Sequence, residues 1–143
     1  SCWNSSKICA CYEAIGCVPF VPPGQGATMA MGCPDVRDVG SRGGLGYVRI
    51  LWKATTKGHN VEFLAGPKMD LLPKRSKIDE VHSVVFKIPG VYVYGCTPHG
   101  SMGMLGLIIV GNDFHNIEKV KEIELSRVAS SVLKRLIRVA RAD

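Results

Sequence analysis

Four side chains that can bind a soft metal stand out in this sequence. Cys96, His99 and Met104 fall in one short loop with the spacing Cys96-x2-His99-x4-Met104, which is rich in Gly and Pro. A further imidazole, His59, lies far upstream beside a glycine. Cu(I) favours thiolate, thioether and imidazole ligands, and Cu(II) tolerates imidazole and thiolate, so a His2Cys set with a weak Met suits both oxidation states. We therefore predict one mononuclear copper site held by His59, Cys96, His99 and Met104.

Other roles for these residues stay open at this level. A cysteine at the end of a strand is commonly a packed hydrophobe, and a cysteine with a histidine three residues on can be a nucleophile with its base. A catalytic pair would also need an orienting group and an oxyanion pocket, and the sequence around Cys96 suggests neither. Met102 and Met104 could instead fill gaps in a core. His82 and His115 have no partner at ligand spacing. We therefore assign His82 to strand packing and His115 to the surface.

Short β-prone runs, separated by turn signals, must position the loop. They cover residues 47–53, 60–64, 81–88, 91–96 and 105–110, whereas 66–77 is typical of a loop. Alternation in 81–88 puts Val84 and Phe86 on one face, and 105–110 is apolar on both faces, as in a central strand. This density of short strands predicts a mainly β fold, a β-sandwich. With 143 residues, 46% of them hydrophobic, the chain suits a single domain with a substantial core.

The last thirty or so residues have helical rather than strand-like spacing. A short helix is expected to end near residue 124, and a longer one to cover 126–142. The apolar stripe of the longer helix comprises Val128, Ala129, Val132, Leu133, Leu136, Ile137, Val139 and Ala140. Its other face carries Arg127, Lys134, Arg135, Arg138 and Arg141. Such a face can bind a membrane surface or nucleic acid, but a helix packed on the sheet with a solvated basic face is the favoured interpretation.

The charge of the chain narrows the choice of partners. A net charge of +6 and a pI of about 9.1 favour an acidic partner and give a long-range steering field. The sequence lacks the alternation of basic and aromatic residues that forms a base-stacking platform, so nucleic acid is not expected. It also has no run of 18 or more apolar residues, so no membrane insertion is expected.

The first 46 residues resist assignment to regular elements. They contain all the cysteines except Cys96, which are Cys2, Cys9, Cys11, Cys17 and Cys33. Their spacing does not match a structural zinc site. Scattered small, partly buried thiols are favoured over a soft-metal or disulfide cluster. Residues 36–46, with four glycines and alternating charges, are typical of a loop.

Two stretches carry a family resemblance. Residues 56–62 (Thr-Lys-Gly-His-Asn-Val-Glu) and 90–104, which include Cys-Thr-Pro-His and Met-Gly-Met, resemble the pseudoazurins, a group of type 1 (blue) copper proteins in the cupredoxin family. The likeness runs from about residue 48 to the C-terminus. It does not extend over residues 1–46, and the five cysteines there depart from the single cysteine usual in the family. Gly100 also stands where an aromatic residue is common, which suggests looser packing beside His99.

The resemblance implies a fold and a set of roles. The fold would be a cupredoxin-like Greek-key β-sandwich of about eight strands with two C-terminal α-helices in a tail at 112–143. His59, Cys96, His99 and Met104 would be the copper ligands. Asn60 would hold the two ligand loops together through hydrogen bonds. Residues expected on the docking face for a redox partner are Lys57, Pro98 and Met102.

The resemblance also implies a function. The protein would be a monomeric electron carrier rather than an enzyme, binding one copper that cycles between Cu(I) and Cu(II). It would work in the periplasm and donate to copper nitrite reductase in denitrification. One alternative is a protein that binds and delivers copper without redox cycling, in which Met102, Met104 and the N-terminal thiols handle Cu(I). Another is a cupredoxin domain cut from a larger copper enzyme, which the helical tail disfavours.

Overall fold

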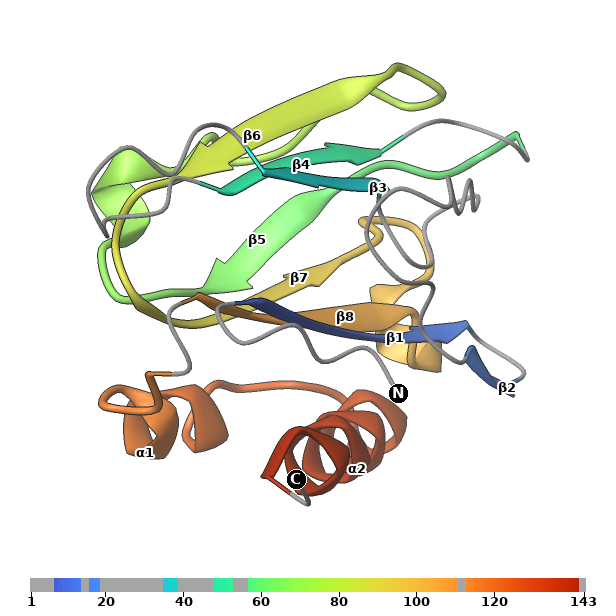
Figure 1. Cartoon of the computed structure of the whole chain (residues 1–143). Helices are drawn as coiled ribbons and strands as arrows, with labels where there is room; N and C mark the ends of the chain where they lie inside the picture. Colours follow the sequence, from blue (N-terminus) through green and yellow to red (C-terminus); the bar gives the residue numbers. More distant parts are fainter. Residues whose placement is uncertain are drawn as a thin grey trace.

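Two antiparallel sheets face each other in the computed structural model of the chain (Figure 1). The structure describes residues 7–13, 16–18, 35–38, 48–52, 57–110 and 113–141. One sheet has five strands in the order β2-β1-β8-β7-β5, and the other has three in the order β3-β4-β6. The strands are β1 (Lys7–Glu13), β2 (Gly16–Val18), β3 (Asp35–Asp38), β4 (Val48–Trp52), β5 (Glu62–Ala65), β6 (His82–Phe86), β7 (Gly90–Gly95) and β8 (Leu105–Val110).

Two α-helices lie beneath the outer face of the five-stranded sheet (Figure 1). They are α1 (Ile117–Lys121) and α2 (Arg127–Arg141), and short 3-10 turns occupy η1 (Met69–Leu71) and η2 (Gly100–Met102). The helix α2 packs against β8 and β1, which confirms the sheet-packed helix as the favoured interpretation. The expected β-sandwich with two C-terminal helices is likewise confirmed. Among the described residues, no helix has the length and apolar character needed to cross a membrane.

Strands β7 and β8 are buried on both faces because each contributes side chains to two hydrophobic cores. One core lies between the helices and the large sheet and includes Val91 and Val93 of β7. The other lies between the two sheets and includes Tyr92 and Tyr94 of the same strand. Side chains of a strand alternate between its faces, so consecutive residues of β7 enter opposite cores. The apolar run at 105–110 is thereby confirmed as a central strand, with β1 on one side and β7 on the other.

The structure corrects the expectations for the N-terminal segment in part. Residues 36–38 belong to β3 instead of a loop, since Asp35–Asp38 pairs with β4. The strand β1 pairs with β8 from Lys7 to Tyr12, and β2 extends the same sheet. Backbone pairing with a neighbouring strand stabilises these segments, and local propensity reports such pairing poorly. Cys9 and Cys11 lie in β1 and Cys17 in β2, whereas Cys2 and Cys33 fall outside the described residues.

Smaller differences affect three other segments. The strand expected at 60–64 begins at Glu62, and the loop at 66–77 contains η1 and a single bridge between Arg75 and Glu62. Val128, expected in the apolar stripe of α2, is 52% exposed. It occupies the first turn of the helix, beside η2 rather than under the sheet. The alternation predicted for 81–88 is confirmed, since Val84 and Phe86 are buried while Ser83 and Val85 are exposed.

Candidate metal centre

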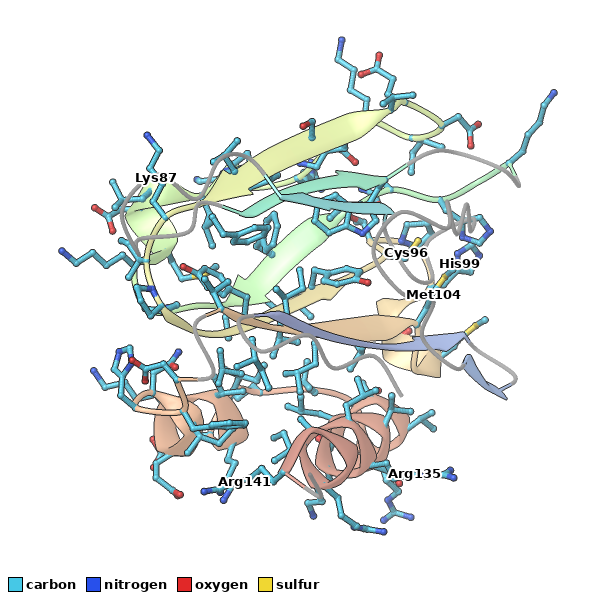
Figure 2. All side chains as sticks on the ribbon, in the orientation of Figure 1. Lys87, Cys96, His99, Met104, Arg135 and Arg141 are labelled. Atoms are coloured by element: carbon cyan, nitrogen blue, oxygen red, sulfur yellow. The ribbon has the colours of Figure 1, made fainter. Side chains whose placement is uncertain are left out.

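Three neighbouring strands bring the predicted ligands to one end of the sandwich. His59 precedes β5, Cys96 directly follows β7, and Met104 directly precedes β8. The pairings of Glu62 with Gly95 and of Gly95 with Leu105 place the start of β5, the end of β7 and the start of β8 side by side. Figure 2 shows Cys96, His99 and Met104 gathered at that end. The antiparallel order of β5, β7 and β8 is thus what unites residues far apart in sequence.

The thiol of Cys96 faces two imidazole nitrogens. Its Sγ lies 3.7 Å from Nδ1 of His59 and 3.4 Å from Nδ1 of His99. The three donor atoms all lie within 4.8 Å of one another, and the ring centroids of His59 and His99 are 4.7 Å apart. Cys96 is a free thiol and only 2% exposed, whereas both imidazoles are half-buried. The site is therefore closed at the sulfur and reaches the surface through the histidine rings.

These separations fit a single metal ion. With bonds of about 2.3 Å to a thiolate and about 2.0 Å to an imidazole meeting at about 110–120°, the two donor atoms lie about 3.5–3.7 Å apart. The sulfur-to-nitrogen distance of 3.7 Å to His59 lies in this range, and that of 3.4 Å to His99 is just below it. One thiolate, two imidazoles and a nearby thioether form a donor set that suits copper in both of its common oxidation states. The residues present therefore fit a copper ion.

Met104 is held beside the other three by the backbone of the same loop. The N–H of Cys96 donates to the carbonyl of Met104 at 3.1 Å, and the N–H of Met104 donates to the carbonyl of His99 at 3.3 Å. Gly103, which directly precedes Met104, has φ = 97°, in the left-handed region that favours glycine. Met104 is 4% exposed and shares the inter-sheet core with Cys96. Its thioether is therefore kept on the buried side of the loop.

Asn60 joins the two ligand-bearing segments by hydrogen bonds. Its Oδ1 accepts from the N–H of Thr97 at 2.7 Å, and its Nδ2 donates to Oγ1 of Thr97 at 2.8 Å. The same Nδ2 donates to the carbonyl of Ser76 at 3.2 Å. Asn60 is only 6% exposed, so loss of these partners would leave a buried amide unpaired. The contacts are those that the family resemblance implied for this residue.

The His59 side of the site has a support of its own. The N–H of Gly58 donates to Oδ1 of Asp79 at 2.7 Å, and the N–H of Asp79 donates to the carbonyl of His59 at 2.9 Å. Ser76 adds two further bonds to Val61, one through its Oγ and one through its N–H. Sequence reasoning missed Asp79, Ser76 and Thr97, because short polar residues in loops give no signal for the distant segment that they bind.

The other predicted residues are found on the surface around the site or away from it. Lys57, Pro98 and Met102 are exposed, and Met102 is 52% exposed at the end of η2.

His82 packs in its strand with its ring 6.0 Å from that of Trp52, and burial lowers its pKa. His115 is exposed, and the hydrogen bonds of its backbone N–H and then of its Nδ1 to Oδ1 of Asp113, both 2.8 Å long, lower the pKa of that carboxyl. Both histidines therefore occupy the positions expected for them.

The comparison with known proteins agrees with this geometry. The family model of copper-binding proteins of the plastocyanin/azurin family matches residues 46–111 of this chain. A protein of Rhizobium leguminosarum bv. viciae assigned as a pseudoazurin is 46% identical over 83 residues, which cover 57% of this chain and 53% of that protein. The pseudoazurin of Paracoccus pantotrophus is 36% identical over 80 residues, 52% of each chain. The chain thus spans about half the length of the curated relatives it matches.

Solved structures give the same result. The structure of a pseudoazurin from Sinorhizobium meliloti aligns with a TM-score of 0.60 at 32% identity, covering 66% of this chain and 74% of that one. The pseudoazurin of Methylobacterium extorquens AM1 aligns with a TM-score of 0.57 at 30% identity, covering 64% and 76%. The chain belongs to the plastocyanin/azurin family of copper-binding proteins, the cupredoxins. Within that family it groups with the pseudoazurins, as the ligand loop led us to expect.

Proposed function

We propose that this chain is a blue copper protein that carries single electrons between redox partners and performs no bond chemistry. His59, Cys96, His99 and Met104 would hold one copper ion. The observation that carries the proposal is the placement of the buried Cys96 sulfur 3.7 and 3.4 Å from two imidazole nitrogens, at one end of the sandwich. The pseudoazurin relatives support the same conclusion.

The polypeptide would hold the metal-binding atoms in place and exclude water from them. When bound, copper supplies a one-electron couple between Cu(I) and Cu(II). Cys96 and Met104 are 2% and 4% exposed, so water has little access to their sulfur atoms. Hydrogen bonds from Asn60 to Thr97 and from Gly58 to Asp79 fix the two ligand segments. A site fixed in this way changes little between oxidation states, which favours rapid electron transfer.

The partner would dock where the site reaches the surface. His99 is half-buried, and Pro98 and Met102 are exposed beside it. Lys57 is exposed on the loop that precedes His59, and the chain as a whole has a net charge of +6. An acidic partner would be steered to such a protein. We propose that this partner is copper nitrite reductase, in denitrification in the periplasm, and this part rests on the resemblance to pseudoazurins.

Copper loading followed by visible spectroscopy tests the copper centre. We expect one copper per chain and an intense visible absorption from charge transfer between the Cys96 thiolate and Cu(II). Cys96→Ala should remove the band, while His115→Ala, which changes an exposed histidine bonded to Asp113, should retain it. A loaded protein without colour would overturn the proposal. Several Cu(I) ions per chain with no blue form would favour copper delivery instead.

Ionic strength tests the docking surface separately. If positive charge steers the encounter, the rate of electron transfer to an acidic partner should fall as salt rises, because the Debye length shrinks from about 30 Å at 0.01 M to about 10 Å at 0.1 M. Lys57→Gln should reduce the rate at low salt and flatten its salt dependence. A rate that is indifferent to salt would remove charge-guided docking and leave the copper centre standing.

A further inference from the structure

A carboxylate reaches the ligand loop from the neighbouring strand. Glu62 is the first residue of β5, and its backbone pairs with Gly95, which directly precedes Cys96. Its Oε2 accepts a hydrogen bond of 2.6 Å from Oγ1 of Thr97, which directly follows Cys96. Strand register and side chain therefore attach Glu62 to both neighbours of the cysteine.

This bond determines the direction of the hydrogen bonds beyond it. A threonine hydroxyl has a single hydrogen, and that of Thr97 is given to Glu62. The hydroxyl oxygen is then left to accept from Nδ2 of Asn60, at 2.8 Å. The same orientation of the Asn60 amide directs its Oδ1 to the N–H of Thr97, at 2.7 Å, and its Nδ2 also to the carbonyl of Ser76, at 3.2 Å. Glu62 thus fixes the direction of the Thr97 hydroxyl in the contacts that join the two ligand segments.

The bond has the features of one that an ionised acceptor strengthens. Hydroxyl-to-carboxylate bonds are typically about 2.5–2.7 Å long and roughly twice as strong as neutral ones. The 2.6 Å separation between Thr97 and Glu62 falls in this range. A glutamine of the same shape would accept the hydrogen less strongly, whereas alanine would leave the hydroxyl without this acceptor.

The side of the loop that Glu62 approaches borders a cavity. The residue is half-buried and borders a cavity of about 240 Å³ that also touches Cys96, Thr97 and Gly100. A Cβ added at Gly100 would meet nothing within 4 Å, so this side of the loop is open. The hydrogen bonds that run from Glu62 through Thr97 therefore add a restraint from the neighbouring strand to the backbone bonds within the loop, such as that from the N–H of Cys96 to the carbonyl of Met104.

We propose that Glu62 is a positioning residue of the metal centre, acting through Thr97 to restrain the segment that carries Cys96 and His99 and thereby setting the reduction potential of the bound metal. The effect on the potential rests on the proposed copper function. The restraint itself is a property of the polypeptide and can be measured without metal. The hydrogen-bonded route from Glu62 to the segment of Cys96 and His99 runs through the hydroxyl of Thr97.

The metal-free protein provides the first test. We expect Glu62→Gln to raise the hydrogen-exchange rate of the Thr97 amide about three- to tenfold, because the bonds that close over it are weakened. Thr97→Ser keeps the hydroxyl and should retain the wild-type rate. Glu118→Gln is the matched control, since Glu118 is an exposed carboxylate on α1 that accepts a bond from Lys121. Equal rates in Glu62→Gln and Glu118→Gln would overturn the proposal.

The copper-loaded protein provides the second test, in a double-mutant cycle with Thr97→Val. Glu62→Gln should raise the reduction potential by an amount that corresponds to a two- to fivefold change in the Cu(I)/Cu(II) ratio, about 18–41 mV at 59 mV per tenfold. At least half of this shift should disappear when Thr97 is valine. A shift of the same size in both backgrounds would show a direct effect of charge and refute the route through Thr97. The absence of any shift in Glu62→Gln would also refute that route. Failure to form a blue site would count against the proposed function alone, since the exchange test needs no copper.

Discussion

The side chain of Asn116 binds both backbone polar groups of Val91. The N–H of Val91 donates to Oδ1 of Asn116 at 2.8 Å, and Nδ2 of Asn116 donates to the carbonyl of Val91 at 2.9 Å. Val91 lies in β7, and β5 pairs with that strand only as far as Val93. The amide of Asn116 therefore takes the place of a missing strand residue. It also fastens the start of α1 to the central sheet.

Loss of this amide should cost a large part of the stability. In Asn116→Ala, a buried N–H and a buried C=O lose their partners, and each such loss costs about 1–3 kcal/mol. Asn116 itself is only 8% exposed, so water replaces it poorly. We expect denaturant unfolding to show a loss of about 2–4 kcal/mol. Lys119→Ala, at an exposed position of α1, should change the free energy of unfolding by less than about 0.5 kcal/mol and serves as the control.

Two glycines of the ligand loop should respond differently to alanine. Gly103 has φ = 97°, and a Cβ there would lie 2.9 Å from Cγ2 of Val132 in α2. Gly103→Ala should therefore reduce the free energy of unfolding by about 1–3 kcal/mol, through backbone strain and a clash. Gly100 has no atom within 4 Å of its added Cβ, so Gly100→Ala should be close to neutral. Thermal unfolding of the two variants would reveal the difference, and equal melting temperatures would contradict the prediction.

The packing of α2 on the sheet gives a third prediction. Leu136 is 1% exposed and belongs to the core between the helices and the large sheet. Leu136→Ala should lose about 2–5 kcal/mol through lost burial and the cavity left behind. Val128 lies on the same helix but is 52% exposed. Val128→Ala is therefore expected to lose less than about 1 kcal/mol, and a similar loss in both variants would argue against the placement of α2.

The phenol of Tyr92 should make the stability fall in alkaline solution. Burial raises the pKa of Tyr92 from 10.0 to about 12, and its hydroxyl donates to the carbonyl of Ile88 at 2.6 Å. Above pH 10 the unfolded chain releases this proton while the folded chain retains it, so stability falls as pH rises from 10 to 12. The slope from this group is at most about 1.4 kcal/mol per pH unit.

Tyr92→Phe isolates that contribution. The variant loses one hydrogen bond at neutral pH, worth about 1 kcal/mol. Between pH 10 and 12 its stability should decline less steeply than that of the wild type. Urea unfolding at several pH values measures both effects, and parallel declines of the two proteins would show that another group titrates there.

The sequence alone was informative wherever a pattern repeats locally. Alternation predicted β6, the two-sided apolar run predicted β8 as a central strand, and helical spacing predicted α2 to within a residue or so. Each of these patterns reflects burial of side chains at a fixed period along one element. The period alone does not predict burial where burial depends on a neighbouring element. Val128 fits the helical period, but it lies in the first turn of α2 and is 52% exposed.

The N-terminal strands show the limit of such reasoning. The strand β1 combines lysine, cysteine and alanine with few β-branched residues, yet it pairs with β8 from Lys7 to Tyr12. β3 is short and charged, and its place follows from pairing with β4. Main-chain hydrogen bonds to a partner strand stabilise both segments, and no side-chain pattern records those bonds.

By itself, the sequence determined the chemistry of the site. The identities of Cys96, His99 and Met104 and their spacing in one loop are covalent facts, and they restrict the choice of metal before any fold is known. The tertiary structure decided the contacts between distant segments. These are the 3.7 Å approach of His59 to Cys96, the bonds of Asn60 and Glu62 to Thr97, and the hold of Asn116 on Val91. The physical reason is that such contacts depend on the antiparallel register of β5, β7 and β8, which the whole chain must fold to establish.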